Sequence, residues 1–384
     1  MTSLKFKLAA FGVAVALAAC GGGDSGPVFN SVVSFGDSLS DLGTYKVGTI
    51  AAIGGGKWTV NGPDARNWTE VVAAGDSISL PCPAQTGMLP NITGFQGAPV
   101  TDHPECANYA QGSARVSNPF GSPSAVAMQA APFNQQNIGL LATPVNTQLS
   151  RHLARTGGSY SGSELVTVTV GGNDLFMNLY GVASAAAGGA TAVGTAAAAG
   201  WDPSVQAAVA AGGAAAAQAA TTAAVTAMGQ AGAELAGLVK SQVLGKGARY
   251  VAVFNLPDVS KTPFGLTLDS QSRQLVTTMV VTFNSQLQAG LAGTPALLID
   301  AYTRSHDWTA NPAKYGITNV TTQACSTTSP ANPLQGSSLG CTSASTVTPD
   351  TSGYFYADDV HPTPLGYRLM AQLAQEQIRA AGWR

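Results

Sequence analysis

The chain has little charge of either sign. Among its 384 residues, Lys and Arg number 18 and Asp and Glu number 20, so charged residues make up only 10% of the sequence. Proteins that bind nucleic acid need a dense Lys and Arg surface for the phosphates, so nucleic acid is excluded as a partner. The hydrophobic fraction of 45% excludes a chain kept disordered by its charge. What remains is a globular protein long enough to bury a substantial core.

Two further absences narrow the class. The 45 glycines follow no Gly-X-Y period, which excludes a collagen-like helix. No two cysteines have C-x-x-C spacing near a histidine, as structural zinc sites require, so we expect no bound metal.

The first twenty residues have the pattern of an export signal. Two lysines precede an apolar run that is too short to span a bilayer but typical of a signal-peptide core. The run ends at Cys20 in a segment that resembles a bacterial lipobox, followed by a Gly-rich stretch suited to a tether. We therefore expect a signal peptide over residues 1–19 and a lipidated flexible tether over residues 20–28. The alternative is ordinary cleavage after an Ala-x-Ala-like site, with Cys20 incidental.

The cysteine count fits export. Five cysteines leave one unpaired, and assigning Cys20 to a lipid leaves an even four. An oxidising compartment favours disulfides. Three pairings are possible, and the nearest-neighbour one joins Cys82 with Cys106 and Cys325 with Cys341. We expect an exported protein, anchored by its lipid in the bacterial cell envelope at the outer membrane, or otherwise periplasmic or secreted.

Short apolar runs alternate with helical patterns over the rest of the chain. Thr363 is a plausible N-cap and Pro364 the first residue of a final amphipathic helix. Near-continuous apolar strands separated by helices predict a parallel sheet covered on both faces. The predicted strands are 29–35, 165–170, 250–254 and 296–300, and a helix is predicted at 273–291.

Polar side chains follow two of the predicted strands and precede the last helix. Ser38 comes just after the first strand, where parallel α/β sheets place reactive groups. Asn173 follows the next strand, and its amide can donate to an oxyanion. His361 lies before the final helix, and a histidine base needs a carboxylate to fix its tautomer. Asp358 and Asp359 are both near enough, and spacing favours Asp358.

These elements together resemble the blocks of the SGNH, or GDSL, family of lipases and esterases. The segment around Ser38 matches the first block, residues 108–112 are similar to the second, residues 171–174 match the third and residues 358–363 match the last. The blocks occur in the family's order. The resemblance implies one domain over residues 29–384, a flavodoxin-like three-layer α/β/α sandwich with a parallel sheet of about five strands.

The resemblance also implies a serine hydrolase that needs no cofactor. Ser38 would attack an ester carbonyl, His361 would take its proton, and Asp358 would orient the ring. The backbone N–H groups of Ser38 and Gly112 and the side chain of Asn173 would hold the oxyanion. We expect an exported esterase or lipase for acyl esters, with a lipid anchor on Cys20 as its membrane contact and no protein partner.

Two alternatives remain open. One is phospholipase or acyltransferase activity on membrane lipids. The other is a catalytically silent member of the same fold that serves as an envelope lipoprotein. A complete triad with its oxyanion donors argues against the silent form, because a binding role would not need them together.

Residues 181–238 stand apart in composition. Of these 58 residues, 26 are Ala and 10 are Gly, and only Asp202 and Glu234 carry charge. Ala favours helix and paired glycines interrupt it, so two or three helices are expected in this insertion. The segment is either a helical layer or spacer packed on the sheet, or a mobile lid whose apolar face borders the active site.

Overall fold

The computed structural model describes residues 29–383, except residues 91–92, 130 and 136–137. The predicted signal peptide and tether, with Cys20, lie outside the described residues. No helix within the described part of the chain combines the length and apolar character needed to cross a bilayer.

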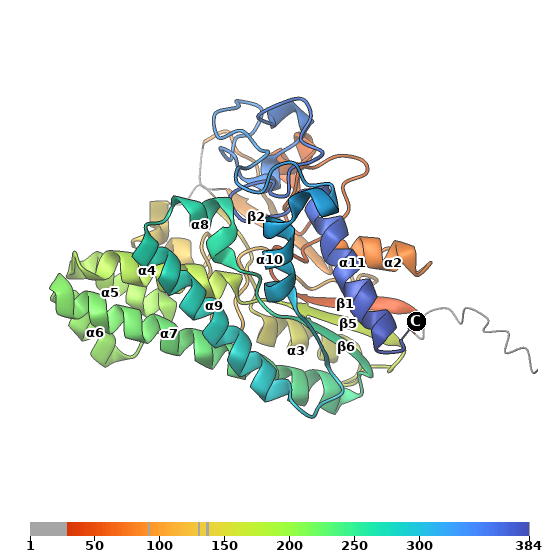
Figure 1. Cartoon of the computed structure of the whole chain (residues 1–384), viewed down its shortest axis with the longest axis horizontal. Coiled ribbons are helices and arrows are strands. Elements are labelled where there is room, and N and C mark those ends of the chain that lie inside the picture. Colours follow the sequence, from red (N-terminus) through yellow and green to blue (C-terminus); the bar gives the residue numbers. More distant parts are fainter. Residues whose placement is uncertain (1–28, 91–92, 130, 136–137, 384) are drawn as a thin grey trace, which may run out of the picture.

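The central sheet is built from four parallel strands in the order β1, β5, β6, β7. Figure 1 shows β1, β5 and β6 side by side. β-Branched residues pair in parallel register across it, with Val33 opposite Val166 and Val166 opposite Val251. The apolar runs predicted as strands are therefore confirmed. The strand bounds are Ser31–Gly36 for β1, Glu164–Thr169 for β5, Tyr250–Phe254 for β6 and Leu297–Ile299 for β7.

Two helix starts are set by side-chain caps. The Thr363 hydroxyl accepts the Gly366 N–H at the start of α11, and Pro364 is its first residue, as predicted. α9 begins three residues before the predicted start because Asp269 caps it and accepts the Ser272 N–H at 2.9 Å. The described α-helices are α1 (Gly48–Ala52), α2 (Trp68–Gly75), α3 (Val145–Arg155), α4 (Gly172–Ala185), α5 (Gly189–Ala199), α6 (Pro203–Ala210), α7 (Gly213–Leu238), α8 (Pro263–Thr267), α9 (Ser270–Leu291), α10 (Ala301–Ala310) and α11 (Pro364–Ala380).

Hydrophobic cores lie on both faces of the sheet. Because side chains alternate along a strand, Val251 and Val253 of β6 face one core, and Ala252 and Phe254 face the other. Helices α3, α4, α7 and α9 complete the first core, and α2, α10 and α11 complete the second. The protein is a three-layer α/β/α sandwich, as the sequence predicts.

The sheet has four regular strands where about five were predicted. An irregular segment pairs with the free edge of β1, where Tyr109 N–H donates to the Ser34 carbonyl at 2.7 Å and Gln111 N–H to the Gly36 carbonyl at 3.1 Å. The segment then turns, since Ala114 N–H donates back to the Gln111 carbonyl. This edge brings the second motif block beside the end of β1.

Two disulfides hold the loops. Cys82 is bonded to Cys106 and Cys325 to Cys341, which is the nearest-neighbour pairing. The first lies beside a small antiparallel sheet in the order β3, β2, β4. The strands of this sheet are β2 (Gln85–Pro90), β3 (Ala98–Asp102) and β4 (Ile138–Gly139).

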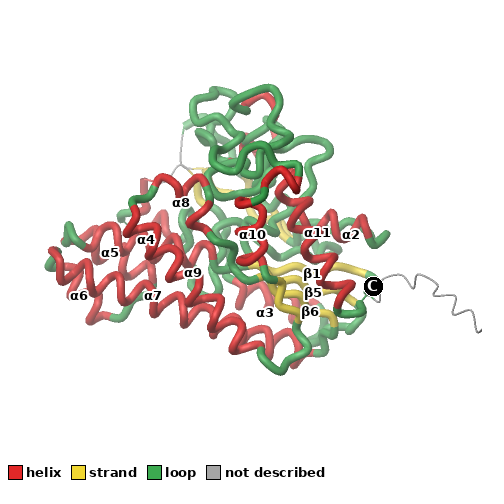
Figure 2. Tube along the Cα trace, in the orientation of Figure 1, coloured by secondary structure: helices red, strands yellow, loops and turns green. Residues whose placement is uncertain are grey.

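The Ala-rich insertion forms helices that pack as a layer. Its glycine pairs lie at the starts of α5 and α7, where the N-cap residues Gly188 and Gly212 have φ of +73° and +70°. α7 buries small side chains such as Ala220 and Ala224 against the core shared with α4 and α9. Figure 2 shows α5, α6 and α7 as a helical block to one side of the sheet.

Two glycines of α7 test how tightly this layer packs. A Cβ at Gly232 would lie 2.3 Å from the Phe283 carbonyl oxygen of α9, whereas one at Gly237 would meet nothing within 4 Å. We expect Gly232→Ala to lower the free energy of unfolding by about 1–3 kcal/mol through overpacking. Gly237→Ala should leave it unchanged or raise it by up to about 1 kcal/mol. Urea unfolding of both variants measures this, and equal effects would contradict close packing of α7 on α9.

Candidate active site

Ser38 lies in the turn that follows β1. Gly36 ends the strand, and a Cβ there would lie 2.1 Å from the Thr169 carbonyl oxygen at the end of β5, so only glycine permits this approach. The Asp37 carboxylate accepts the Leu39 N–H at 3.0 Å and shapes the turn. Ser38 is thereby presented at the carboxyl end of the sheet.

A chain of hydrogen bonds joins Ser38, His361 and Asp358. His361 Nδ1 lies 2.8 Å from both carboxylate oxygens of Asp358, and His361 Nε2 lies 2.8 Å from Ser38 Oγ. An ionised carboxylate only accepts, so Nδ1 carries the proton and Nε2 is free to accept the Ser38 hydroxyl proton. This is the geometry of a nucleophile, a base and a group that orients the base.

The carboxylate beside His361 is that of Asp358, not of Asp359. Asp358 is 5% exposed and accepts backbone N–H groups from His361 at 2.7 Å, Ser338 at 2.9 Å and Val360 at 3.1 Å. Asp359 instead lines the cavity described below. The structure therefore brings together the three residues that the sequence predicts as a triad.

Nearby charges and burial shift the pKa values of Asp358 and His361 in opposite directions. Burial raises the pKa of Asp358, but the charge and hydrogen bonds of His361 and a hydrogen bond from Ser338 outweigh it, so the pKa is lowered. Burial lowers the pKa of His361, but the charges of Asp358, Asp359 and Asp37 raise it above its usual 6.5. The carboxylates thus make His361 a stronger base.

Trp58 packs on the imidazole and was not predicted from the sequence. Its ring centroid lies 4.8 Å from that of His361, with the planes at 35°. Tyr45 packs edge-on against Trp58. Trp58 comes from the loop between α1 and α2, and no motif in the sequence marks it.

A cavity of about 230 Å³ opens above Ser38. Ser38, His361 and Asn173 all line it, together with aromatic rings and two carboxylates. No Lys or Arg lies among its described lining residues. The aromatic rings are those of Trp58, Phe176, Tyr180 and Phe264, and the carboxylates are Asp37 and Asp359.

Gly112 does not present its N–H to this cavity, contrary to the prediction. The Gly112 N–H donates to the buried carboxylate of Asp41 at 2.9 Å. Glycine is required at this position for another reason, because a Cβ would lie 2.4 Å from Trp58 Cζ2. The next residue, Ser113, lines the cavity with φ of +66°.

Asn173 does line the cavity, at the start of α4. Its Nδ2 donates one hydrogen to the Ala114 carbonyl at 3.0 Å, which fixes the amide and leaves the second hydrogen available. Within the described residues, no hydrogen bond engages the backbone N–H groups of Ser38 or Ser113. Ser38, Ser113 and Asn173 all line the cavity and each keep a donor hydrogen that no described residue engages.

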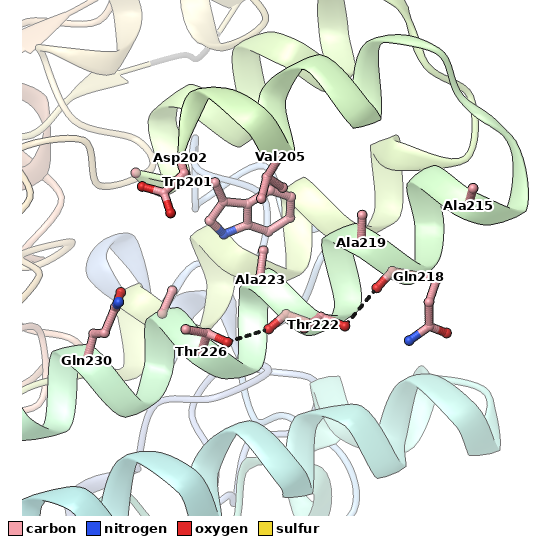
Figure 3. Close-up of a pocket in the computed structure, with 12 residues that line it drawn as sticks. Trp201, Asp202, Val205, Ala215, Gln218, Ala219, Thr222, Ala223, Thr226 and Gln230 are labelled. Carbon is pink, nitrogen blue, oxygen red and sulfur yellow. Dashed lines mark hydrogen bonds between the residues drawn. The ribbon is translucent and has the colours of Figure 1, made fainter.

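The Ala-rich insertion contributes nothing to the catalytic cavity, so the lid hypothesis is not supported. No residue of 181–238 lines that cavity, because the buried face of α7 packs into the core. A separate cavity of about 620 Å³ lies between α7 and the segment that joins α5 to α6 (Figure 3). There the hydroxyls of Thr222 and Thr226 donate to carbonyls of their own helix (Figure 3), so neither is poised as a nucleophile.

A hydroxyl, an imidazole and a carboxylate in sequence at the carboxyl end of a parallel sheet are the arrangement found in serine hydrolases. The chain belongs to the family of GDSL-like lipases and acylhydrolases, whose model matches residues 32–374.

Curated relatives carry matching names. The chain is 27% identical over 157 residues to a GDSL esterase/lipase of Arabidopsis thaliana, and the matched region covers 38% of this chain and 42% of that protein. It is 32% identical over 145 residues to Esterase EstA of Pseudomonas aeruginosa, covering 35% of this chain and 20% of that protein. The chain therefore spans less than half the length of these relatives.

Replacing each carboxylate separates their roles. Asp358→Asn should lower kcat by about 10⁴-fold, because the ring loses its tautomer and orientation. Asp359→Asn should lower kcat by less than about tenfold, since it makes no hydrogen bond to His361. The base must be neutral to act, so removing the Asp359 charge lowers the pKa of His361 and moves the acid limb of the kcat/KM profile to lower pH. A similar loss of kcat in both variants would contradict the assignment.

Proposed function

We propose that the protein is an exported serine esterase that cleaves carboxylic esters through an acyl-enzyme on Ser38. The observation that carries the proposal is the continuous contact from Ser38 Oγ through His361 to the buried carboxylate of Asp358. Membership of a lipase and acylhydrolase family supports the reaction class. The contact also argues against a silent lipoprotein, which would not need a base within 2.8 Å of the serine.

The geometry supports a two-step reaction. Ser38 Oγ attacks the ester carbonyl as its proton passes to His361 Nε2, and Asp358 stabilises the imidazolium that forms. The tetrahedral intermediate collapses, His361 gives the proton to the departing alcohol, and the acyl group stays on Ser38. Water then loses a proton to His361, attacks the acyl-enzyme and releases the carboxylic acid.

Negative charge develops on the former carbonyl oxygen in both steps. Ser38, Ser113 and Asn173 line the cavity where that oxygen would lie, and the backbone N–H groups of the two serines and the free amide hydrogen of Asn173 are the donors proposed for it. Donors fixed before the reaction stabilise this charge without reorganising, and this is usually the largest contribution to such catalysis. The amide of Asn173 is held in place by the Ala114 carbonyl.

The cavity favours an uncharged acyl ester. Aromatic and aliphatic side chains dominate its lining, and its acidic groups are Asp37 and Asp359. Burial raises the pKa of Asp37 to about 7. With no Lys or Arg among the described lining residues, the cavity offers no cationic partner for a phosphate, so simple acyl esters fit better than phospholipid headgroups.

Export and lipid anchoring at Cys20 are part of the proposal. They rest on the signal-like pattern of residues 1–19 and the lipobox-like segment that ends at Cys20. The two disulfides fit an oxidising compartment.

Hydrolysis of p-nitrophenyl esters tests the proposed function. The purified chain should hydrolyse esters from acetate to palmitate with a measurable preference, and Ser38→Ala should abolish turnover because no nucleophile remains. His361→Gln serves as a second inactive control. Turnover that survives in Ser38→Ala, or a wild-type chain inactive on every acyl length, would contradict the proposal.

The oxyanion donors are tested by two variants of neighbouring cavity residues. Asn173→Ala removes a donor and should lower kcat by about 10²–10³-fold with little change in KM. Ser113→Gly keeps its backbone N–H and suits the positive φ, so kcat should stay within a few-fold of wild type. Steady-state kinetics on one ester measure both. A small loss in Asn173→Ala would refute its role as an oxyanion donor.

A further inference from the structure

In the part of the chain that the structure describes, the Asp358 carboxylate has one hydrogen-bond donor from outside its own turn. The N–H groups of Val360 and His361 and the His361 ring belong to the turn that Asp358 begins. The fourth donor is the backbone N–H of Ser338, 20 residues earlier in the chain and 2.9 Å from Oδ2. Among the described residues, this donor alone ties the carboxylate by a hydrogen bond to a distant segment of the chain.

The Ser338 segment has little regular structure to hold it. Between Tyr315 and Pro364, the described chain contains no α-helix and no β-strand. It contains two short 3-10 helices, Ser338–Gly340 and Ser343–Ser345. Ser338 is nevertheless fully buried. Something other than secondary structure must fix its N–H against Asp358.

The Cys325–Cys341 disulfide closes a loop of the chain that contains Ser338. Cys341 N–H donates to the Ser338 carbonyl at 3.2 Å, and Cys325 N–H donates to the carbonyl of Ala357, next to Asp358, at 2.8 Å. Both cysteines are fully buried and pack with Ala357 in one small cluster. The disulfide thus connects the residue beside Asp358 to the residue that donates to its carboxylate.

Asn61 joins the same disulfide loop to the segment that carries Trp58, a residue that lines the cavity. The side-chain amide of Asn61 donates to the carbonyls of Ser338 and Cys341, each at 3.0 Å. Asn61 lies three residues after Trp58, whose ring packs on His361. The disulfide loop and the imidazole are therefore supported by one continuous set of contacts.

We propose that the Cys325–Cys341 disulfide is a positioning element of the active site, which holds the Ser338 N–H on the Asp358 carboxylate. The proposal rests on the proposed function and adds to it a role for residues that touch neither substrate nor the reacting atoms. Without the disulfide, the loop admits water to Asp358. The carboxylate then loses a fixed donor, and water screens its charge from His361.

A matched pair at residue 338 tests the hydrogen bond itself. Ser338→Pro removes the N–H at the first position of a 3-10 turn, where proline is tolerated, and Ser337 before it has the extended ψ of 133° that proline requires. Ser338→Ala keeps the N–H and removes the buried hydroxyl alone, so it separates the backbone donor from the side chain. We expect Ser338→Pro to lower kcat by about 10- to 100-fold with KM within about threefold. Ser338→Ala should lose at least about threefold less kcat than Ser338→Pro, because it keeps the backbone donor.

A matched pair of disulfide variants tests the role of the covalent link. Cys325→Ala/Cys341→Ala should behave like Ser338→Pro in kcat. Cys82→Ala/Cys106→Ala removes the other disulfide, which in the described structure makes no hydrogen bond to Asp358, His361 or Ser338. This control should retain kcat within about threefold of wild type, even where its thermal midpoint falls. Circular dichroism establishes that each variant is folded.

The pKa of the His361 ring, followed by NMR, gives a readout that needs no turnover. It should shift in Ser338→Pro and in Cys325→Ala/Cys341→Ala, because burial and the charge of Asp358 together set it, shift less in Ser338→Ala, and stay unchanged in Cys82→Ala/Cys106→Ala. Unchanged kcat and an unchanged His361 pKa in the first two variants would overturn the positioning role while leaving the esterase intact. A wild-type chain without esterase activity would refute the proposed function, and the NMR titration would still decide whether the disulfide positions Asp358.

Discussion

The hydrogen bond between Ser38 and His361 is the contact on which the site depends. It joins residues 323 positions apart, one after the first strand and the other before the last helix. The sheet and α11 must pack in one arrangement for the two side chains to meet at 2.8 Å. The two hydrophobic cores provide that arrangement, because they fix strands and helices on both faces of the sheet.

A buried carboxylate outside the triad holds two of the motif blocks together by hydrogen bonds. The buried Asp41 carboxylate accepts the N–H groups of Gly43, Thr44 and Gly112 and so joins the first motif block to the second. Burial raises the pKa of Asp41, and these donors oppose the shift. A buried carboxylate is costly unless its oxygens are satisfied, so Asp41 serves as a structural link between the two blocks.

Local patterns in the sequence predicted the parts of the fold that local forces determine. Apolar runs gave the strands, and the Thr363 cap with Pro364 gave the last helix. Family resemblance grouped Ser38, Asp358 and His361, which the structure brings into contact.

Contacts between distant segments were not predictable in the same way. Trp58, Ser113 and Ser338 reach the site from loops, where no periodicity or cap marks a side chain. Glycine at 112 fits the family block but serves close packing on Trp58, and its N–H is taken by Asp41. The Ala-rich composition of 181–238 predicted helices, yet composition alone did not tell a packed layer from a lid.

The most direct measurement is covalent labelling with a fluorophosphonate followed by peptide mass spectrometry. We expect one adduct, on the peptide that contains Ser38, formed far more slowly in His361→Gln; an active chain that is unlabelled, or labelled at another residue, would contradict the assignment of Ser38 as the nucleophile.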